Sequence, residues 1–129
     1  MGLFNLFGNK EQAKKEHKVL PWQKLSEVHQ IAEIANSSKQ RPAIIFKHST
    51  SCGISRMVLR NFESSYEINP EAADLYYLDL LAFRGVSNEV VAQFQVIHQS
   101  PQVLVIKNGQ AVFHASHHGI HAQELENFI

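Results

Sequence analysis

The sequence has a single cysteine among its 129 residues, so the chain cannot close an internal disulfide. A disulfide-stapled domain is therefore excluded, and the lone thiol fits a reducing compartment, which favours the cytoplasm. An excess of charge of one sign is also lacking, because 12 basic residues balance 12 acidic ones. Without a broad cationic surface, nucleic acid and anionic membranes are poor candidates as partners. No internal repeat is visible, and the length favours one domain that can bury a core without disulfides or metals.

Long hydrophobic runs are lacking too. The apolar residues at the start end at Phe7 and are followed by the polar stretch Glu11 to Lys18. This is too short for a signal peptide or a membrane-spanning helix. Gly2 does not begin a myristoylation signal, because Leu6 stands where Ser or Thr is required. We expect residues 1–18 to form a flexible tail before a domain over residues 19–129, with a membrane-touching or partner-docking segment as the alternative.

From Leu20 onward, hydrophobic periodicity predicts alternating helices and strands. The expected order begins with a short strand near Val19, a helix over residues 22–35, a buried strand over 43–47 and a helix that begins near Cys52. A central strand over 75–81 and a helix capped by Ser87 follow. The chain then continues with a strand over 102–107, a turn of the primed type at Asn108-Gly109, a returning strand over 111–115 and a closing helix that carries Leu125 and Phe128. This pattern predicts an α/β fold with a central mixed sheet flanked by helices.

The cysteine stands between a buried strand and a helix, in Phe46-Lys47-His48-Ser49-Thr50-Ser51-Cys52-Gly53-Ile54-Ser55. The free N–H groups and the positive dipole end of the helix favour the thiolate of Cys52. Lys47 and His48 could support that anion, but alternation along a strand allows only one of them to turn toward the sulfur. Ser55 follows one helical turn later, so its hydroxyl can point back and donate a hydrogen bond to the thiolate.

These residues also have structural interpretations. An isolated cysteine is usually a small buried hydrophobe, but the polar neighbours Thr50, Ser51 and Gly53 favour an open site that a substrate can reach. Ser55 could be an ordinary residue of the first helical turn. Pro101 could simply open an edge strand.

The cysteine loop and the later stretch from Ser100-Pro101 to the Asn108-Gly109 turn resemble those of thioredoxin-like proteins. More narrowly, the string Lys-His-Ser-Thr-x-Cys-x-Ile-Ser, with Ser116-His117, is similar to the monothiol bacilliredoxins, thioredoxin-like proteins of the bacillithiol system that are also described as general-stress proteins. The resemblance covers about Trp22 to Ile129. Phe46 departs from many thioredoxins, which keep a buried Asp at that place.

This resemblance implies a thioredoxin-like fold in which Pro101 is the family's cis-proline. The backbone of Ser100 would then pair with an extended substrate by strand addition. It also implies that no cofactor is bound and that bacillithiol is the co-substrate. The residues alone leave glutathione, coenzyme A and cysteine equally open as the small thiol.

The histidines raise the question of a metal, since four of the eight gather near the C-terminus: His114, His117, His118 and His121. Their spacing matches no standard ligand motif, and adjacent histidines on a strand or loop point apart. We therefore expect no metal site, with His117 packed or hydrogen-bonded locally.

Two classes of function fit these features. In the first, Cys52 takes a low-molecular-weight thiol from an S-thiolated client protein and so acts as a monothiol thiol-disulfide oxidoreductase. In the second, the chain is a non-catalytic binding or redox-sensing module whose Cys52 becomes S-thiolated as a signal. A homodimer linked through Cys52 is a third possibility, and the sequence leaves the oligomeric state open.

Overall fold

The computed structural model describes residues 18–129, so the tail expected over residues 1–18 lies outside the described residues except for Lys18. Helices and strands alternate along the described range, as expected. They are β1 (Trp22–Lys24), α2 (His29–Ser37), β2 (Ala43–His48), α3 (Gly53–Ser65), β3 (Asp74–Asp79), α4 (Arg84–Phe94), β4 (Gln102–Lys107), β5 (Gln110–Ser116) and α5 (Ala122–Leu125), with 3₁₀ turns over His117–Gly119 and Glu126–Phe128. None of these helices is long and apolar enough to cross a membrane.

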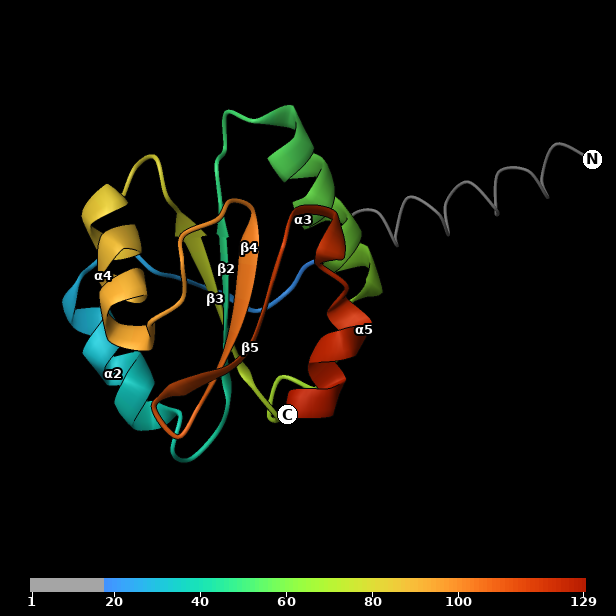
Figure 1. Cartoon of the computed structure of the whole chain (residues 1–129). Coiled ribbons are helices and arrows are strands. Elements are labelled where there is room, and N and C mark those ends of the chain that lie inside the picture. The colour runs from blue at the N-terminus through green and yellow to red at the C-terminus, as the bar shows by residue number, and fades with distance from the viewer. Residues whose placement is uncertain (1–17) are drawn as a thin grey trace, which may run out of the picture.

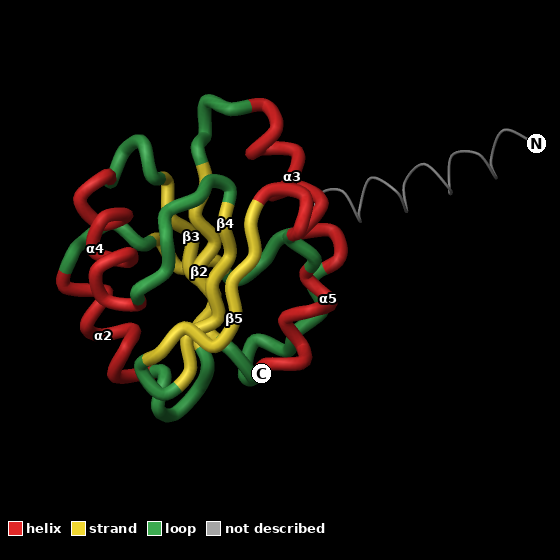
Figure 2. Tube along the Cα trace, in the orientation of Figure 1, coloured by secondary structure: helices red, strands yellow, loops and turns green. Residues whose placement is uncertain are grey.

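The five strands form one mixed sheet in the order β1-β3-β2-β4-β5. The pairs β1·β3 and β2·β3 are parallel, whereas β4 runs antiparallel to both β2 and β5. Figures 1 and 2 show α2 and α4 on one side of this sheet and α3 and α5 on the other. Because β2 and β3 are parallel and β4 is antiparallel, the C-terminal ends of β2 and β3 meet the start of β4 at one end of the sheet. This end carries the loop to Cys52 and the peptide bond before Pro101.

Both faces of the sheet are buried, and side chains alternate between two cores. Phe46 packs among α3 and α5 with Phe62 and Leu125, while Ile45 packs among α2 and α4 with Ile34. All six residues of β2 are buried, which explains why that strand reads as a nearly continuous apolar run. The same alternation sends Lys47 to the α2 and α4 side and His48 to the α3 side.

The expected helix over residues 22–35 is wrong in its first part. Trp22–Lys24 is instead the edge strand β1, paired with β3 from Leu75 to Tyr77, and α2 begins only at His29. The side chain of Gln30 explains the late start, because its Oε1 accepts hydrogen bonds from the backbone N–H groups of Ser26 and Glu27, both at 2.8 Å. A local bond of this kind satisfies donors that a longer helix would have used itself.

Ser87 does not cap α4, contrary to expectation. The helix begins at Arg84, and Ser87 is 3% exposed inside it, where its backbone N–H donates to the carbonyl of Phe83 at 3.0 Å. The helical pattern thus extends one turn before the serine that the sequence suggested as its start.

The β4–β5 hairpin is confirmed in position and turn type. Asn108 and Gly109 have φ angles of 53° and 78°, and positive φ at both central residues is the mark of a type I′ turn. The turn also docks onto the end of α2, because the Gly109 N–H donates to Oγ of Ser38 at 2.8 Å. This contact joins segments that are far apart in the sequence.

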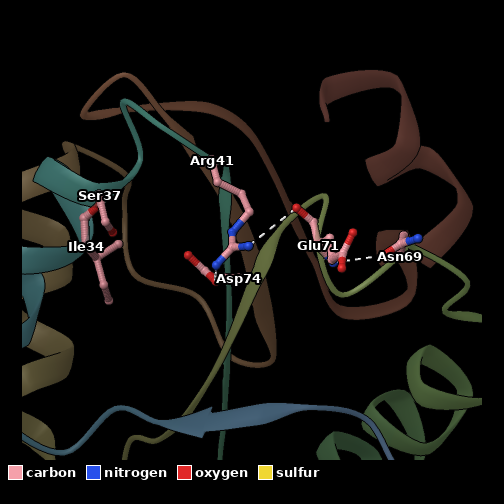
Figure 3. A network of polar contacts seen from close by, with 6 residues as sticks. All are labelled: Ile34, Ser37, Arg41, Asn69, Glu71 and Asp74. Carbon is pink, nitrogen blue, oxygen red and sulfur yellow. Dashed lines mark hydrogen bonds and ion pairs between the residues drawn. The ribbon is translucent and has the colours of Figure 1, made fainter.

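A polar network closes the opposite end of the sheet (Figure 3). Arg41, just before β2, forms an ion pair of 2.7 Å with Asp74 at the start of β3 and also donates to the carbonyl of Glu71. Glu71 N–H donates in turn to Oδ1 of Asn69 at 2.8 Å. The network lies at the start of β2, and His48 at the other end of this strand leads to the cysteine loop.

Candidate active site

Cys52 is an exposed free thiol at the N-cap of α3. Its backbone N–H donates to the carbonyl of Ser49 at 3.2 Å, and its own carbonyl accepts from Arg56 N–H at 3.0 Å. The cysteine therefore belongs both to the tight loop after β2 and to the first turn of the helix. The interpretation of Cys52 as a buried hydrophobe is wrong, and its place at the helix start is as expected.

The neighbours of the thiol are largely open to solvent. Thr50, Ser51 and Gly53 are exposed, so a substrate can reach them, and Oγ of Ser49 lies 3.3 Å from Oγ of Ser51. Ile54, two residues after the thiol, is 56% exposed. Met57 is 47% exposed on the same helix. Two exposed apolar side chains thus follow the thiol on α3.

Ser55 does not form a hydrogen bond with the sulfur of Cys52, contrary to the prediction from the sequence. Its side chain is 1% exposed, and its Oγ lies 3.1 Å from Nδ1 of His48 and accepts a hydrogen bond from the N–H of Ser49 at 3.2 Å. Among the hydrogen bonds of residues 18–129, none joins Ser55 to Cys52. The hydroxyl holds the loop that carries the thiol, and its contribution to the reaction stays a prediction.

Lys47 and His48 diverge, as alternation predicted. Lys47 is fully buried on the α2 and α4 side, where its Nζ lies 3.0 Å from Nδ1 of His98. Burial lowers the pKa of Lys47 to about 8. It lies on the opposite face from α3, so of the two residues only His48 is on the side of the thiol loop.

His48 is almost fully buried at the end of β2, and both of its ring nitrogens have partners. Nδ1 meets Ser55, and Nε2 lies 2.6 Å from the hydroxyl of Tyr77 on β3. Burial lowers the pKa of His48, and the nearby carboxylate of Asp79 opposes that effect. Asp79 is only half-buried, and its Oδ1 accepts from the N–H groups of Leu81 and Ala82, so it closes a turn as well. Sequence reasoning missed Tyr77, because only the β2–β3 register brings it to His48.

The Ser100–Pro101 peptide bond is cis, as expected. Gln102 pairs with Lys47 in the register of β4 and β2, which places Pro101 beside the end of β2. Pro101 does not open an edge strand, because β4 lies between β2 and β5. Among residues 18–129, Oγ of Ser100 and Oε1 of Gln102 are the buried side-chain atoms that have no hydrogen-bond partner.

Of the four C-terminal histidines, His117, His118 and His121 line one small pocket beside α3. His117 has a φ of 56° and its N–H donates to the carbonyl of Pro101 at 3.0 Å, so it fastens the end of β5 beside the proline. Within the described part of the chain, no group of three or more His, Cys, Asp or Glu side chains could hold a metal ion.

A cavity of about 390 Å³ lies at the β1–β3 edge of the sheet. It is lined by aromatic and charged side chains: Trp22, Lys24, Tyr77, Asp79, Ala82 and Phe83. Cys52 is not among them. The cavity meets the site through Tyr77, whose hydroxyl contacts His48.

Comparisons with known proteins agree with this geometry. Residues 23–125 match the family described as monothiol bacilliredoxin BrxC. A solved structure described as a putative oxidoreductase with a thioredoxin fold is 27% identical, covers 82% of this chain and 91% of its own, and superposes with a TM-score of 0.69. Thioredoxin from Malassezia sympodialis is 22% identical over 87% of this chain and 93% of its own, with a TM-score of 0.62. Thioredoxin from Fasciola hepatica is 17% identical over 83% of this chain and 95% of its own, with a TM-score of 0.63.

The likeness to the two thioredoxins establishes the fold, and the family match covers most of the chain. The family and the single exposed cysteine together support a thiol-disulfide redox function with a thiol as co-substrate. The chain has a thioredoxin fold and belongs to the monothiol bacilliredoxin family.

Proposed function

We propose that the protein removes a low-molecular-weight thiol from mixed disulfides on client proteins through Cys52. The observation that carries this proposal is the exposed free thiol at the N-cap of α3, in a chain that has no second cysteine. A helix N-terminus favours a thiolate, and the thiolate is the nucleophile of disulfide exchange. Because Ser55 stands where a dithiol enzyme has its second cysteine, the mixed disulfide on Cys52 must be resolved by another molecule.

The exchange balances in two steps. The Cys52 thiolate attacks the sulfur of the small thiol in the client's mixed disulfide, a Cys52–small-thiol disulfide forms, and the client leaves as a thiolate that takes a proton from water. A second small thiol, as its thiolate, then attacks the small-thiol sulfur on Cys52. Cys52 is released as a thiolate, and the two small thiols leave as their symmetric disulfide.

We propose bacillithiol as the small thiol, because the chain belongs to the bacilliredoxin family. The chemistry at Cys52 is the same for glutathione, coenzyme A or cysteine, so the choice rests on the family and is tested by comparing donors. A reducing cytoplasm is the compartment that we infer from the lone thiol.

For the client, we propose a binding surface around the thiol. The exposed residues Thr50, Ser51 and Gly53 leave room for an extended chain, and the backbone of Ser100 would pair with it next to Pro101. The exposed apolar side chains of Ile54 and Met57 would contact the client beside the disulfide.

A turnover assay tests this function. A client that carries one bacillithiol mixed disulfide is incubated with a sub-stoichiometric amount of the protein and free bacillithiol, and the client thiol is measured over time, with a glutathione-modified client in parallel. We expect many client thiols released per protein molecule and none above background with Cys52→Ser. Release of no more than one equivalent would contradict catalysis and favour the sensing module.

A further inference from the structure

We propose that Tyr77 and His48 are positioning residues for the exchange at Cys52: they hold the hydroxyl of Ser55, which fixes the loop that presents the thiol. This inference rests on the proposed function, because it assigns how the same thiol is presented. In this arrangement Ser55 acts by accepting a hydrogen bond from the backbone N–H of Ser49, and not by a direct bond to the sulfur.

Four consecutive hydrogen bonds connect Tyr77 on β3 to the cysteine. The hydroxyl of Tyr77 lies 2.6 Å from Nε2 of His48, and Nδ1 of His48 lies 3.1 Å from Oγ of Ser55. The N–H of Ser49 donates to that Oγ at 3.2 Å, and the N–H of Cys52 donates to the carbonyl of Ser49 at 3.2 Å. The first three links join different segments, so the loop is held to β2, β3 and α3 together.

Burial strengthens the central link, between His48 and Ser55. His48 is 2% exposed and Ser55 is 1% exposed, so water cannot replace their partners at low cost. The rings of His48 and Tyr77 also pack edge to face, with their centroids 5.1 Å apart. The imidazole therefore has one orientation, in which both nitrogens face a hydroxyl.

The protonation state of His48 decides which way these bonds run. Ser55 already accepts the Ser49 N–H, so it can donate its own proton to Nδ1 of a neutral His48, whose Nε2–H then donates to Tyr77. When His48 takes up a second proton at Nδ1, this N–H donates to Oγ of Ser55. The Ser55 hydroxyl then keeps its proton but no longer donates it to the imidazole. The cation also lies beside the thiol loop, where positive charge favours the thiolate.

The groups that face His48 come from three elements. Tyr77 and Asp79 approach from β3, Ser55 approaches from α3, and the ring of Phe46 lies 6.1 Å away on the same strand. Burial lowers the pKa of His48 more than the Asp79 carboxylate raises it. His48 is therefore neutral at neutral pH, and its cation forms only below the ordinary value of about 6.5.

The test is the rate of Cys52 alkylation by iodoacetamide between about pH 5 and about pH 9. The full-length chain is used without client or small thiol. The wild-type curve should show two inflections, one from the thiol and one below about pH 6.5 from His48, assigned by NMR titration of its imidazole. A curve with the thiol inflection alone would overturn the proposal.

Tyr77→Phe is the decisive variant, because it keeps the ring and removes one oxygen atom. The Nε2–H of His48 loses its acceptor in both protonation states, and the loss costs the charged imidazole more, so the lower inflection should move to lower pH. Tyr76→Phe is the matched control, because that ring packs on the α2 and α4 side, and it should leave the curve unchanged. Coinciding curves for the two variants would overturn the proposal.

His48→Gln should remove the lower inflection entirely, and Tyr77→Phe carries the test if this variant fails to fold. Alkylation needs neither a client nor bacillithiol. A protein that shows both inflections but releases no client thiol would therefore contradict the proposed function and leave the positioning role standing.

Discussion

Nζ of Lys47 lies 3.0 Å from Nδ1 of His98, which joins the end of β2 to the segment that leads into Pro101. Lys47 is fully buried, and burial lowers its pKa to about 8. The pKa of His98 is lowered as well, by burial first and then by the charges of Lys47 and Arg84. Lys47 thus lies buried on the face of the sheet opposite to Cys52, while its partner His98 is exposed.

This contact predicts that stability rises with pH in the mildly alkaline range. The folded pKa of Lys47 is about 8 and its unfolded pKa is 10.5, so between them the unfolded state binds more protons. The free energy of unfolding should therefore increase from about pH 8 upward, by roughly 1 kcal/mol per pH unit at most. The rise should end near pH 10, where buried tyrosines begin to act in the opposite sense: burial raises the pKa of Tyr66 to about 12.

Urea unfolding at several pH values checks this prediction. The experiment is done with Cys52→Ser, so that the thiol does not titrate, and Lys47→Met is added to it as the control. The pH-dependent rise should be present in the first protein and absent in the second. Parallel curves would show that Lys47 is not responsible.

Replacing Ser55 should loosen the thiol loop. Ser55→Ala leaves the Ser49 N–H and one nitrogen of His48 without their buried partner, at a cost of about 1 to 3 kcal/mol. Ser64→Ala is the matched control on the same helix, since Ser64 is exposed and donates only to the carbonyl of Asn61. Chemical denaturation compares the two, and equal losses would refute the role of Ser55 in holding the loop.

Phe46 should be essential for the core beneath the site. It is fully buried and packs against Trp22 and Phe62, with ring centroids 6.2 Å and 4.9 Å away. Phe46→Ala should therefore lower the free energy of unfolding by about 3 to 5 kcal/mol. Val112→Ala, at a half-exposed position of β5, should change it by less than about 0.5 kcal/mol. A loss for Phe46→Ala as small as that of the control would contradict the packing described here.

Two glycines should respond to alanine with opposite signs. Gly109 has a φ of 78°, which alanine adopts only with strain, so Gly109→Ala should destabilise the hairpin by about 1 kcal/mol or more. Gly85 lies in the first turn of α4 with nothing within 4 Å of an added Cβ, and Gly85→Ala should stabilise by about 0.5 to 1 kcal/mol. Thermal unfolding measures both, and a shift of the same sign would contradict the account.

Local patterns predicted the elements that carry the site. The apolar run of β2, the helix that begins at Cys52 and the Asn108-Gly109 turn each have a signal within a few residues of sequence. Edge strand β1 is different, because its three residues are held by parallel pairing with β3, a partner some fifty residues later in the chain. Apolar spacing in such a short segment fits a helix equally well, so the first helix was placed too early.

The contacts inside the site were predicted less well, for a related reason. A hydroxyl one helical turn after Cys52 has several possible partners, and the sequence favours the nearest one, the sulfur. The actual partner of Ser55 is His48, whose other nitrogen is held by Tyr77. This arrangement depends on the register of β2 against β3, which no local pattern encodes.

The most direct test of the central claim is intact mass spectrometry after mixing the protein with a bacillithiol-modified client. The account predicts that the bacillithiol mass moves to Cys52 while the client loses it, and that free bacillithiol then removes it from the protein. Cys52→Ser should gain no mass, and a glutathione-modified client tested beside it shows whether the small thiol is discriminated. A titratable, exposed Cys52 that takes up no adduct from either client would contradict exchange at this thiol.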